Sequence, residues 1–204
     1  MPDYSRKDYW SGRYDTDAAP GAEPYEWYLG FDELRDILEL LPEDKAQQIV
    51  YVGCGISTLG IELAKEGFSN VTCVDWIQKA VDAASKFLPE ELETPPSFAC
   101  ADIADSTYEN LAAVLDKGLL DSFLTGEEAK TATTALIDRI HGWLAVGSPL
   151  ILISHSDRTK LFGSSTLPWD CSVRQVESGE GRQFFLHVCR RVDPPPEDEA
   201  EERE

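Results

Sequence analysis

Residues 48–57 read QIVYVGCGIS, a short apolar run that ends in two glycines with one residue between them. Such a run, bounded by a glycine turn, is typical of a strand that is buried on both faces. The next residues, 57–66, place Ile61 and Ala64 at helical spacing, and Gly67 follows where the helix is expected to end. The stretch therefore predicts a buried strand, a tight turn and a helix in succession.

Strand-like and helix-like segments alternate along the rest of the chain. The expected strands cover residues 48–52, 70–74, 97–101, 111–115 and 150–154, and the expected helices cover residues 57–66, 77–88 and 127–144. This alternation is typical of an open α/β sheet, mostly parallel, with helices on both faces. Two further strand-like runs, 171–176 and 183–190, are joined by too few residues for a crossover helix. We therefore expect them to form an antiparallel hairpin at the end of the sheet.

The length and composition favour one folded domain. The chain has 204 residues, of which 42% are hydrophobic, so it can build a full core. We expect this domain to cover residues 1–192, and the acidic, proline-rich tail at 193–204 to be disordered. No apolar run is long enough to cross a bilayer, and the first ten residues lack the apolar core of a signal peptide. We expect neither a membrane protein nor a secreted one.

The charge balance bears on possible partners. Thirty-eight acidic residues against eighteen basic ones give a formal net charge of −20. Nucleic acid is repelled by such a surface, whereas a basic protein partner is favoured. The alternative explanation is that the negative charge only increases solubility.

The five cysteines indicate a compartment. Their number is odd and no two of them form a C-x-x-C pair, so the sequence predicts neither a disulfide framework nor a zinc site. We therefore expect a reducing, cytoplasmic environment. We also expect a monomer, because no apolar stripe is left without a partner in the predicted sheet.

Glycines and charged residues follow four predicted strands where each strand ends. Gly53 and Gly55 follow the first strand, Asp75 the second, Asp102 the third and Lys117 the fourth. Each feature alone also occurs in ordinary turns and helix caps. Because open α/β sheets bind ligands at the carboxyl ends of their strands, the set together predicts a ligand site. Asp75 is placed to accept both hydroxyls of a ribose, and Asp102 to accept an adenine amino group.

The third glycine helps to choose the cofactor. A dinucleotide fingerprint requires G-x-G-x-x-G, but here the third glycine, Gly60, is displaced by two positions. The terminal hairpin is also foreign to the dinucleotide fold, and a cationic sulfonium suits an acidic surround. The sequence therefore favours S-adenosylmethionine, with an NAD-dependent oxidoreductase as the less favoured alternative.

Several stretches resemble a known family. IVYVGCGIS at 49–57, NVTCVDW at 70–76, ACADI at 99–103 and VLDKGLLDS at 114–122 resemble the seven-strand, class I methyltransferases. YWSGRY at 9–14 and PYEWYLGF at 24–31 narrow the resemblance to the branch that methylates lysine on translation elongation factor 1-alpha, which includes elongation-factor lysine methyltransferase 4 and methyltransferase-like 13. The resemblance covers about residues 9–191. It implies a Rossmann-like, seven-stranded sheet and S-adenosylmethionine-dependent methylation of a protein lysine.

The resemblance also implies the residues of the site. Matched by position, the cofactor contacts are Trp10, Tyr14, Trp27, Gly53, Asp75, Trp76, Asp102, Ile103 and Lys117, and Gly55 belongs to the same glycine turn. Since Trp10 and Tyr14 are four residues apart and would share a helix face, residues 1–30 are expected to form an aromatic lid over the cofactor. Asp121 is the candidate for holding the incoming lysine ammonium, and the alternative is that it is a helix cap or a solvated charge. His155 is the histidine expected nearest the ligand edge of the sheet.

Some positions depart from the family pattern. Ile56 stands where the family usually has Asn, and Leu119 where it has Thr. The family commonly has an Asp near the start of the fourth strand, and this chain has none in LAAV at 111–114. The segment after Gly126 is shorter than in the relatives. These departures leave open another protein or a small molecule as the methyl acceptor, and also a non-catalytic module that only binds the cofactor.

Overall fold

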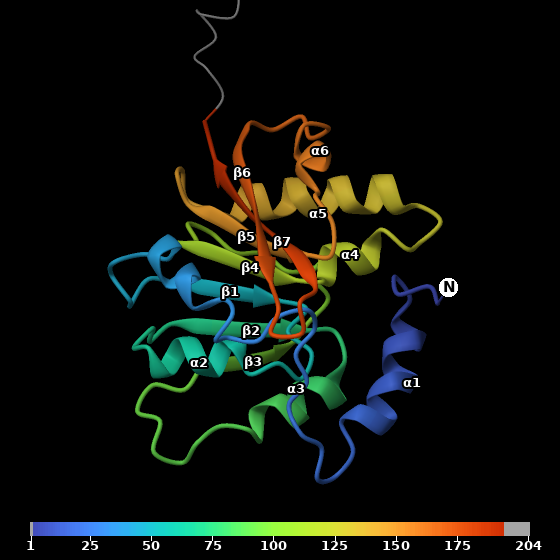
Figure 1. Cartoon of the computed structure of the whole chain (residues 1–204), viewed down its shortest axis with the longest axis vertical. Helices are drawn as coiled ribbons and strands as arrows, with labels where there is room; N and C mark the ends of the chain where they lie inside the picture. Colours follow the sequence, from blue (N-terminus) through green and yellow to red (C-terminus); the bar gives the residue numbers. More distant parts are fainter. Residues whose placement is uncertain (1, 194–204) are drawn as a thin grey trace, which may run out of the picture.

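The computed structural model describes residues 2–193, which form one seven-stranded sheet with helices packed around it (Figure 1). Residues 194–204, most of the predicted acidic tail, lie outside the described part. The strands are β1 (Ile49–Val52), β2 (Val71–Asp75), β3 (Ser97–Cys100), β4 (Ala113–Lys117), β5 (Pro149–Ser154), β6 (Trp169–Glu177) and β7 (Gln183–Arg191). The helices are α1 (Lys7–Asp17), the 3-10 helix η1 (Arg35–Leu40), α2 (Leu59–Lys65), α3 (Gln78–Ser85), α4 (Leu119–Phe123), α5 (Ala129–Trp143) and α6 (Thr159–Phe162).

The strand order β3-β2-β1-β4-β5-β7-β6 sets where a ligand can bind. Strands β1 to β5 pair in parallel, and β7 pairs antiparallel with both β5 and β6. The chain runs outward from β1 to β3 and then returns to β4 on the other side of β1. A crevice opens at such a switch point, outside the carboxyl ends of the strands. The predicted mostly parallel sheet with a terminal hairpin is confirmed.

The register brings the strand ends together. Val52, the last residue of β1, lies opposite Val74 of β2 and Asp116 of β4. Asp75, one residue further along β2, lies opposite Cys100 at the end of β3. The residues that follow β1 to β4 therefore start from one edge of the sheet, and α1 stands beside that edge (Figure 1).

Two layers of core cover the two faces of the sheet. Ile49 and Tyr51 of β1 pack with residues of α2 and of the segment around η1. Val50 and Val52, which alternate with them, pack with residues of α5 on the opposite face. Side chains of a strand alternate between faces, so this short, fully buried strand supplies both cores. Helices on both faces, as the sequence predicts, are confirmed.

The terminal hairpin contains a feature that the sequence analysis excluded. Cys171 of β6 lies opposite Cys189 of β7, and the two form a disulfide with their Cα atoms 4.1 Å apart. The expectation of no disulfide is therefore wrong, because the register of the hairpin, which cysteine spacing does not reveal, places the two thiols face to face.

Among the described helices, none has the length and apolar character that a membrane span requires.

Candidate active site

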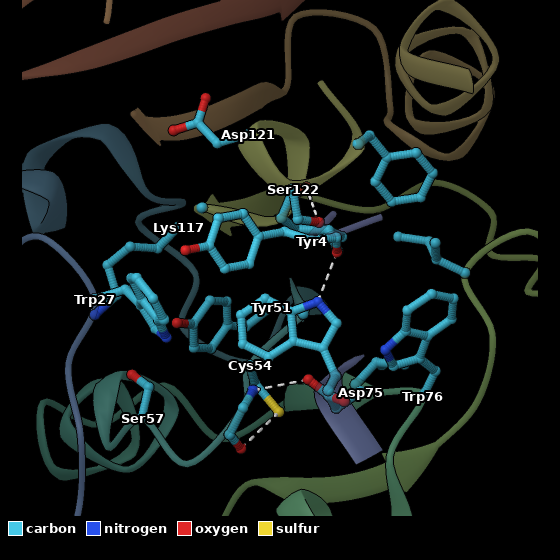
Figure 2. Close-up of a pocket in the computed structure, with 18 of the residues that line it drawn as sticks. Tyr4, Trp27, Tyr51, Cys54, Ser57, Asp75, Trp76, Lys117, Asp121 and Ser122 are labelled. Carbon is cyan, nitrogen blue, oxygen red and sulfur yellow. Dashed lines mark hydrogen bonds between the residues drawn. The ribbon is translucent and has the colours of Figure 1, made fainter. Parts of the chain in front are cut away.

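A cavity of about 310 Å³ lies at the carboxyl edge of the sheet (Figure 2). This volume is at the lower end of the range found for small-molecule sites. Its floor is made by residues that end or follow four strands: Gly53, Cys54, Gly55, Asp75, Trp76, Ala101, Ile103, Lys117, Gly118 and Leu119. Its other walls include aromatic residues from the N-terminal part of the chain: Tyr4, Trp10, Tyr14, Trp27 and Tyr28. The strand ends and the N-terminal aromatics that the sequence indicated thus meet around one hollow.

The glycine turn after β1 is the place where the N-terminal segment docks. Gly53 and Gly55 both have positive φ, 61° and 54°, which L side chains rarely adopt. A Cβ atom on Gly55 would lie 2.6 Å from the Tyr14 hydroxyl oxygen, and one on Gly53 would lie 2.8 Å from the Cβ of Leu119. The two glycines therefore allow Tyr14 of α1 and Leu119 of α4 to pack directly on the turn.

Asp75 ties the glycine turn to β2. Its Oδ2 accepts a hydrogen bond from the Gly55 amide at 2.9 Å, and its Oδ1 accepts one from the Ile77 amide at 2.9 Å. Burial raises the pKa of Asp75, while these backbone donors act to lower it. Each carboxylate oxygen has a second lone pair, so the side chain can still accept ribose hydroxyls. Its predicted contact with a ribose stays a prediction.

Asp102 differs from the other predicted cofactor residues. Its neighbours Ala101 and Ile103 line the cavity, but Asp102 does not. Its Oδ1 accepts a hydrogen bond from the Ala104 amide at 2.9 Å in the turn after β3. The predicted contact with an adenine amino group stays a prediction, and in the described structure it is Ile103 and Trp76 that present apolar surface there.

The N-terminal aromatics form a continuous cluster at the cavity. The ring of Trp10 stacks on that of Tyr14 at 5.9 Å, and it meets Trp27 edge-on at 5.9 Å. The guanidinium of Arg13 lies 4.8 Å from the centre of the Trp27 ring and pairs with Asp17. The expected shared helix face of Trp10 and Tyr14 is confirmed, and Figure 2 shows Trp27 and Trp76 on opposite sides of the pocket. Arg13 lies in the YWSGRY stretch at 9–14 but was not predicted as a site residue, and it supports the aromatic cluster without lining the cavity.

Lys117 lines the cavity, but its ammonium is bound by the chain itself. The side chain is almost fully buried, contacts the carboxylate of Glu26 and donates a hydrogen bond to the Leu29 carbonyl at 2.9 Å. The same carboxylate accepts hydrogen bonds from the Ser57 hydroxyl at 2.6 Å and the Thr58 amide at 2.7 Å. The pair holds residues 25–29 against the sheet. Glu26 was missed, because its partner is distant in sequence.

Asp121 lies at another wall of the cavity, inside a dense polar cluster. Its carboxylate accepts hydrogen bonds from Tyr28 Oη at 2.8 Å, Ser154 Oγ at 2.8 Å and Arg158 Nε at 2.9 Å, and His155 Nδ1 lies 2.9 Å away. Burial acts to raise the pKa of Asp121, but Arg158 and the hydrogen bonds outweigh it and leave the pKa lowered. The side chain is therefore an ionised carboxylate.

The cluster bears on two predicted residues and adds others. Direct contact of Asp121 with a lysine ammonium stays a prediction, and its oxygens already have partners within this chain. His155 does line the cavity, as expected from its place after β5. Tyr28 lies in the PYEWYLGF stretch that carries the resemblance, but neither Tyr28 nor Arg158 was predicted as a site residue. Within residues 2–193, no group of three His, Cys, Asp or Glu side chains is arranged to hold a metal ion.

The sheet order, the terminal hairpin and the cavity at the carboxyl edge together define a Rossmann-like methyltransferase fold, and solved structures share it. The N-methyltransferase NodS of Bradyrhizobium japonicum, in complex with S-adenosyl-L-homocysteine, aligns with a TM-score of 0.63 and 19% identity over 90% of this chain and 98% of that chain. No protein-family model matches the chain. The expected fold class is confirmed.

Two named enzymes show a more specific similarity in sequence. The chain is 28% identical to EEF1A lysine methyltransferase 4 of Mus musculus over 204 residues, which cover 92% of this chain and 76% of that protein. It is 30% identical to the eEF1A lysine and N-terminal methyltransferase of Xenopus laevis over 190 residues, which cover 84% of this chain and 27% of that protein. The resemblance found in the sequence motifs is thereby confirmed.

Proposed function

We propose that this chain is an S-adenosylmethionine-dependent methyltransferase that transfers a methyl group to a lysine side chain of a protein such as translation elongation factor 1-alpha. One observation carries the proposal. The strand ends of a methyltransferase fold and the N-terminal aromatic cluster meet in one cavity, in a chain similar to proteins named as eEF1A lysine methyltransferases.

The residues around the cavity fit this cofactor. Asp75 keeps lone pairs for hydroxyl groups, and Trp76 with Ile103 offers apolar surface for a flat base. Trp10 and Trp27 offer aromatic faces, which attract a cation such as a sulfonium. When bound, S-adenosylmethionine supplies an activated methyl group. We propose that residues 1–30 act as the lid over it, with Tyr14 as the contact on the glycine turn.

The chain itself binds and orients the reactants and excludes water from them. Only a neutral amine is nucleophilic, and a lysine that enters an apolar, aromatic pocket has its pKa lowered because burial disfavours the ammonium. Holding the amine in line with the methyl carbon removes most of the entropic cost of the encounter. The net charge of −20 favours approach of a basic polypeptide. A cytoplasmic location and a monomeric state are part of the same proposal. The location rests on the proposed substrate, because the Cys171–Cys189 disulfide removes the argument from the cysteines for a reducing compartment.

The experiment is to incubate the purified chain with S-adenosylmethionine and elongation factor 1-alpha, and to locate new methyl groups by peptide mass spectrometry. We expect methylation of a lysine. The alternatives give different results. Labelling of another protein in an extract with tritiated S-adenosylmethionine, and none of the factor, would move the substrate elsewhere. Cofactor binding without any labelling would favour a non-catalytic module, and a rise in melting temperature with NADH alone would favour an oxidoreductase.

A further inference from the structure

The backbone of Tyr28 has an uncommon conformation. Its φ is 68°, and within residues 2–193 the other non-glycine residue with positive φ is Asn110. Asn adopts this region readily, whereas a bulky aromatic residue does so only when its surroundings hold it there. Leu29, the next residue, is buried in the core and its carbonyl accepts from Lys117. The strained turn thus lets Trp27 line the cavity while Leu29 enters the core and the Tyr28 ring packs on Phe184.

The hydroxyl of Tyr28 has a defined direction. Because Asp121 is an ionised carboxylate and accepts only, the 2.8 Å bond between them is donated by the phenol. Asp121 is in turn fixed by Ser154 and by two nitrogens of Arg158, at 2.9 and 2.8 Å. With its proton committed to Asp121, the phenol oxygen has two lone pairs. His155 Nδ1, which lies 3.4 Å away, can reach one of them, and the other can accept from another donor. A phenol that donates to a carboxylate is also a stronger acceptor, since adjacent hydrogen bonds polarise one another.

Tyr28 also stands between two hollows. A second groove, of about 570 Å³, runs between residues 25–33 and the turn of the β6–β7 hairpin. Trp27 and Tyr28 line both this groove and the cavity at the strand ends. Trp27 and Tyr28 therefore lie where the groove and the cavity adjoin.

We propose that the Tyr28 phenol oxygen accepts a hydrogen bond from the substrate amine, and that Asp121 and Arg158 act as positioning residues through it. The inference rests on the proposed function. A neutral lysine amine must aim its one lone pair at the methyl carbon, so its N–H groups need acceptors elsewhere. The nitrogen forms a bond to the methyl carbon while the carbon–sulfur bond breaks. The sulfur keeps the electron pair, and the nitrogen carries the positive charge until it releases a proton to solvent.

The hydrogen bond from the amine to the Tyr28 oxygen is strongest in the transition state. The N–H becomes a better donor as positive charge grows on nitrogen, so the fixed dipole of the phenol stabilises the transition state more than the bound amine. The rival explanation is that the Tyr28–Asp121 bond only fastens residues 25–29 to the sheet. That explanation predicts a loss of stability and of cofactor affinity, whereas the proposal predicts a loss in kcat.

The test compares Tyr28→Phe with the wild-type chain and with Tyr108→Phe, the same change at a residue that packs on Trp143 and does not line the cavity. Phenylalanine keeps the packing on Phe184. We expect kcat for lysine methylation to fall by about 100-fold in Tyr28→Phe. S-adenosylhomocysteine affinity and melting temperature should stay close to wild type. Tyr108→Phe should keep the wild-type kcat.

A second arm tests the role of Asp121. If Asp121 acts through Tyr28, the double variant Tyr28→Phe with Asp121→Asn should be no slower than the slower single variant. A Tyr28→Phe enzyme with wild-type kcat, or one that loses cofactor affinity and stability in proportion to its activity, would overturn the inference and leave the proposed function standing. A wild-type chain that methylates no lysine would instead overturn the proposed function, and the inference with it.

Discussion

The ammonium of Lys117, at the end of β4, is paired with the carboxylate of Glu26, ninety-one residues earlier in the chain. Lys117 is 4% exposed, and burial lowers its pKa while Glu26 acts to raise it. The Glu26 carboxylate also accepts hydrogen bonds from Ser57 and Thr58, the two residues that precede α2. One ion pair therefore joins three parts of the cavity wall: β4, the start of α2 and the aromatic segment.

Replacing Lys117 by Met should destabilise the chain by about 3 kcal/mol, because it leaves the Glu26 carboxylate without its cation. The estimate is at the low end for a broken buried pair, since the Glu26 side chain is 23% exposed. Urea unfolding measures the change. Lys65→Met, which breaks the more exposed pair with Glu62, is the matched control and should cost less than about 1 kcal/mol. Equal losses in the two variants would show that the Lys117 pair does not brace the site.

Gly55→Ala should weaken both stability and S-adenosylhomocysteine affinity, because the new Cβ would displace the Tyr14 hydroxyl and with it α1. Gly147→Ala provides the control, since Gly147 also has positive φ but no heavy atom within 4 Å of a Cβ. That variant should lose only the backbone cost of about 1–2 kcal/mol. Adding Tyr14→Phe to Gly55→Ala should recover part of the affinity. If calorimetry shows that both alanine variants bind alike, the Tyr14 contact does not shape the site.

The free energy of unfolding should fall as the pH rises, and the cause is Asp116. This residue is fully buried and accepts hydrogen bonds from the Leu119 and Leu120 amides. Burial, with Asp121 nearby, raises the pKa of Asp116 from 3.8 to about 8. Between these values the unfolded chain has lost the proton that the folded chain keeps, so deprotonation favours unfolding. The free energy of unfolding should drop by up to about 1.4 kcal/mol per pH unit from pH 5 to pH 8.

The matched variant for this effect is Asp116→Asn, which keeps an acceptor oxygen but cannot ionise. Urea unfolding at several pH values should show wild type losing stability relative to the variant as pH rises, with the difference levelling off above pH 8. A difference that is constant with pH would mean that Asp116 is ionised in the folded chain.

Local patterns were enough to predict the sheet. Apolar runs such as residues 49–52 and 150–153 are unambiguous because these strands are buried on both faces. The glycines and Asp75 were found for a related reason, since a residue that follows a parallel strand must lie at the ligand edge. The short helices α4 and α6 were missed, because five and four residues carry too little periodicity to detect.

The contacts that complete the site could not be read from the sequence. Tyr28 and Asp121 are ninety-three residues apart, and neither has a neighbour that signals the other. The same holds for Cys171 and Cys189, whose pairing depends on the register of the hairpin. Asp102 shows the converse problem, since a residue in the right place after a strand can still direct its side chain to a local turn.

The central claim is that one cavity at the strand ends binds S-adenosylmethionine, and calorimetric titration of S-adenosylhomocysteine into wild type and Asp75→Ala tests it most directly. Circular dichroism and thermal melting confirm that the variant is folded. We predict a single binding site in the wild-type chain and loss of measurable binding in the variant. Equal affinity in the two proteins, or no binding to wild type, would contradict the account.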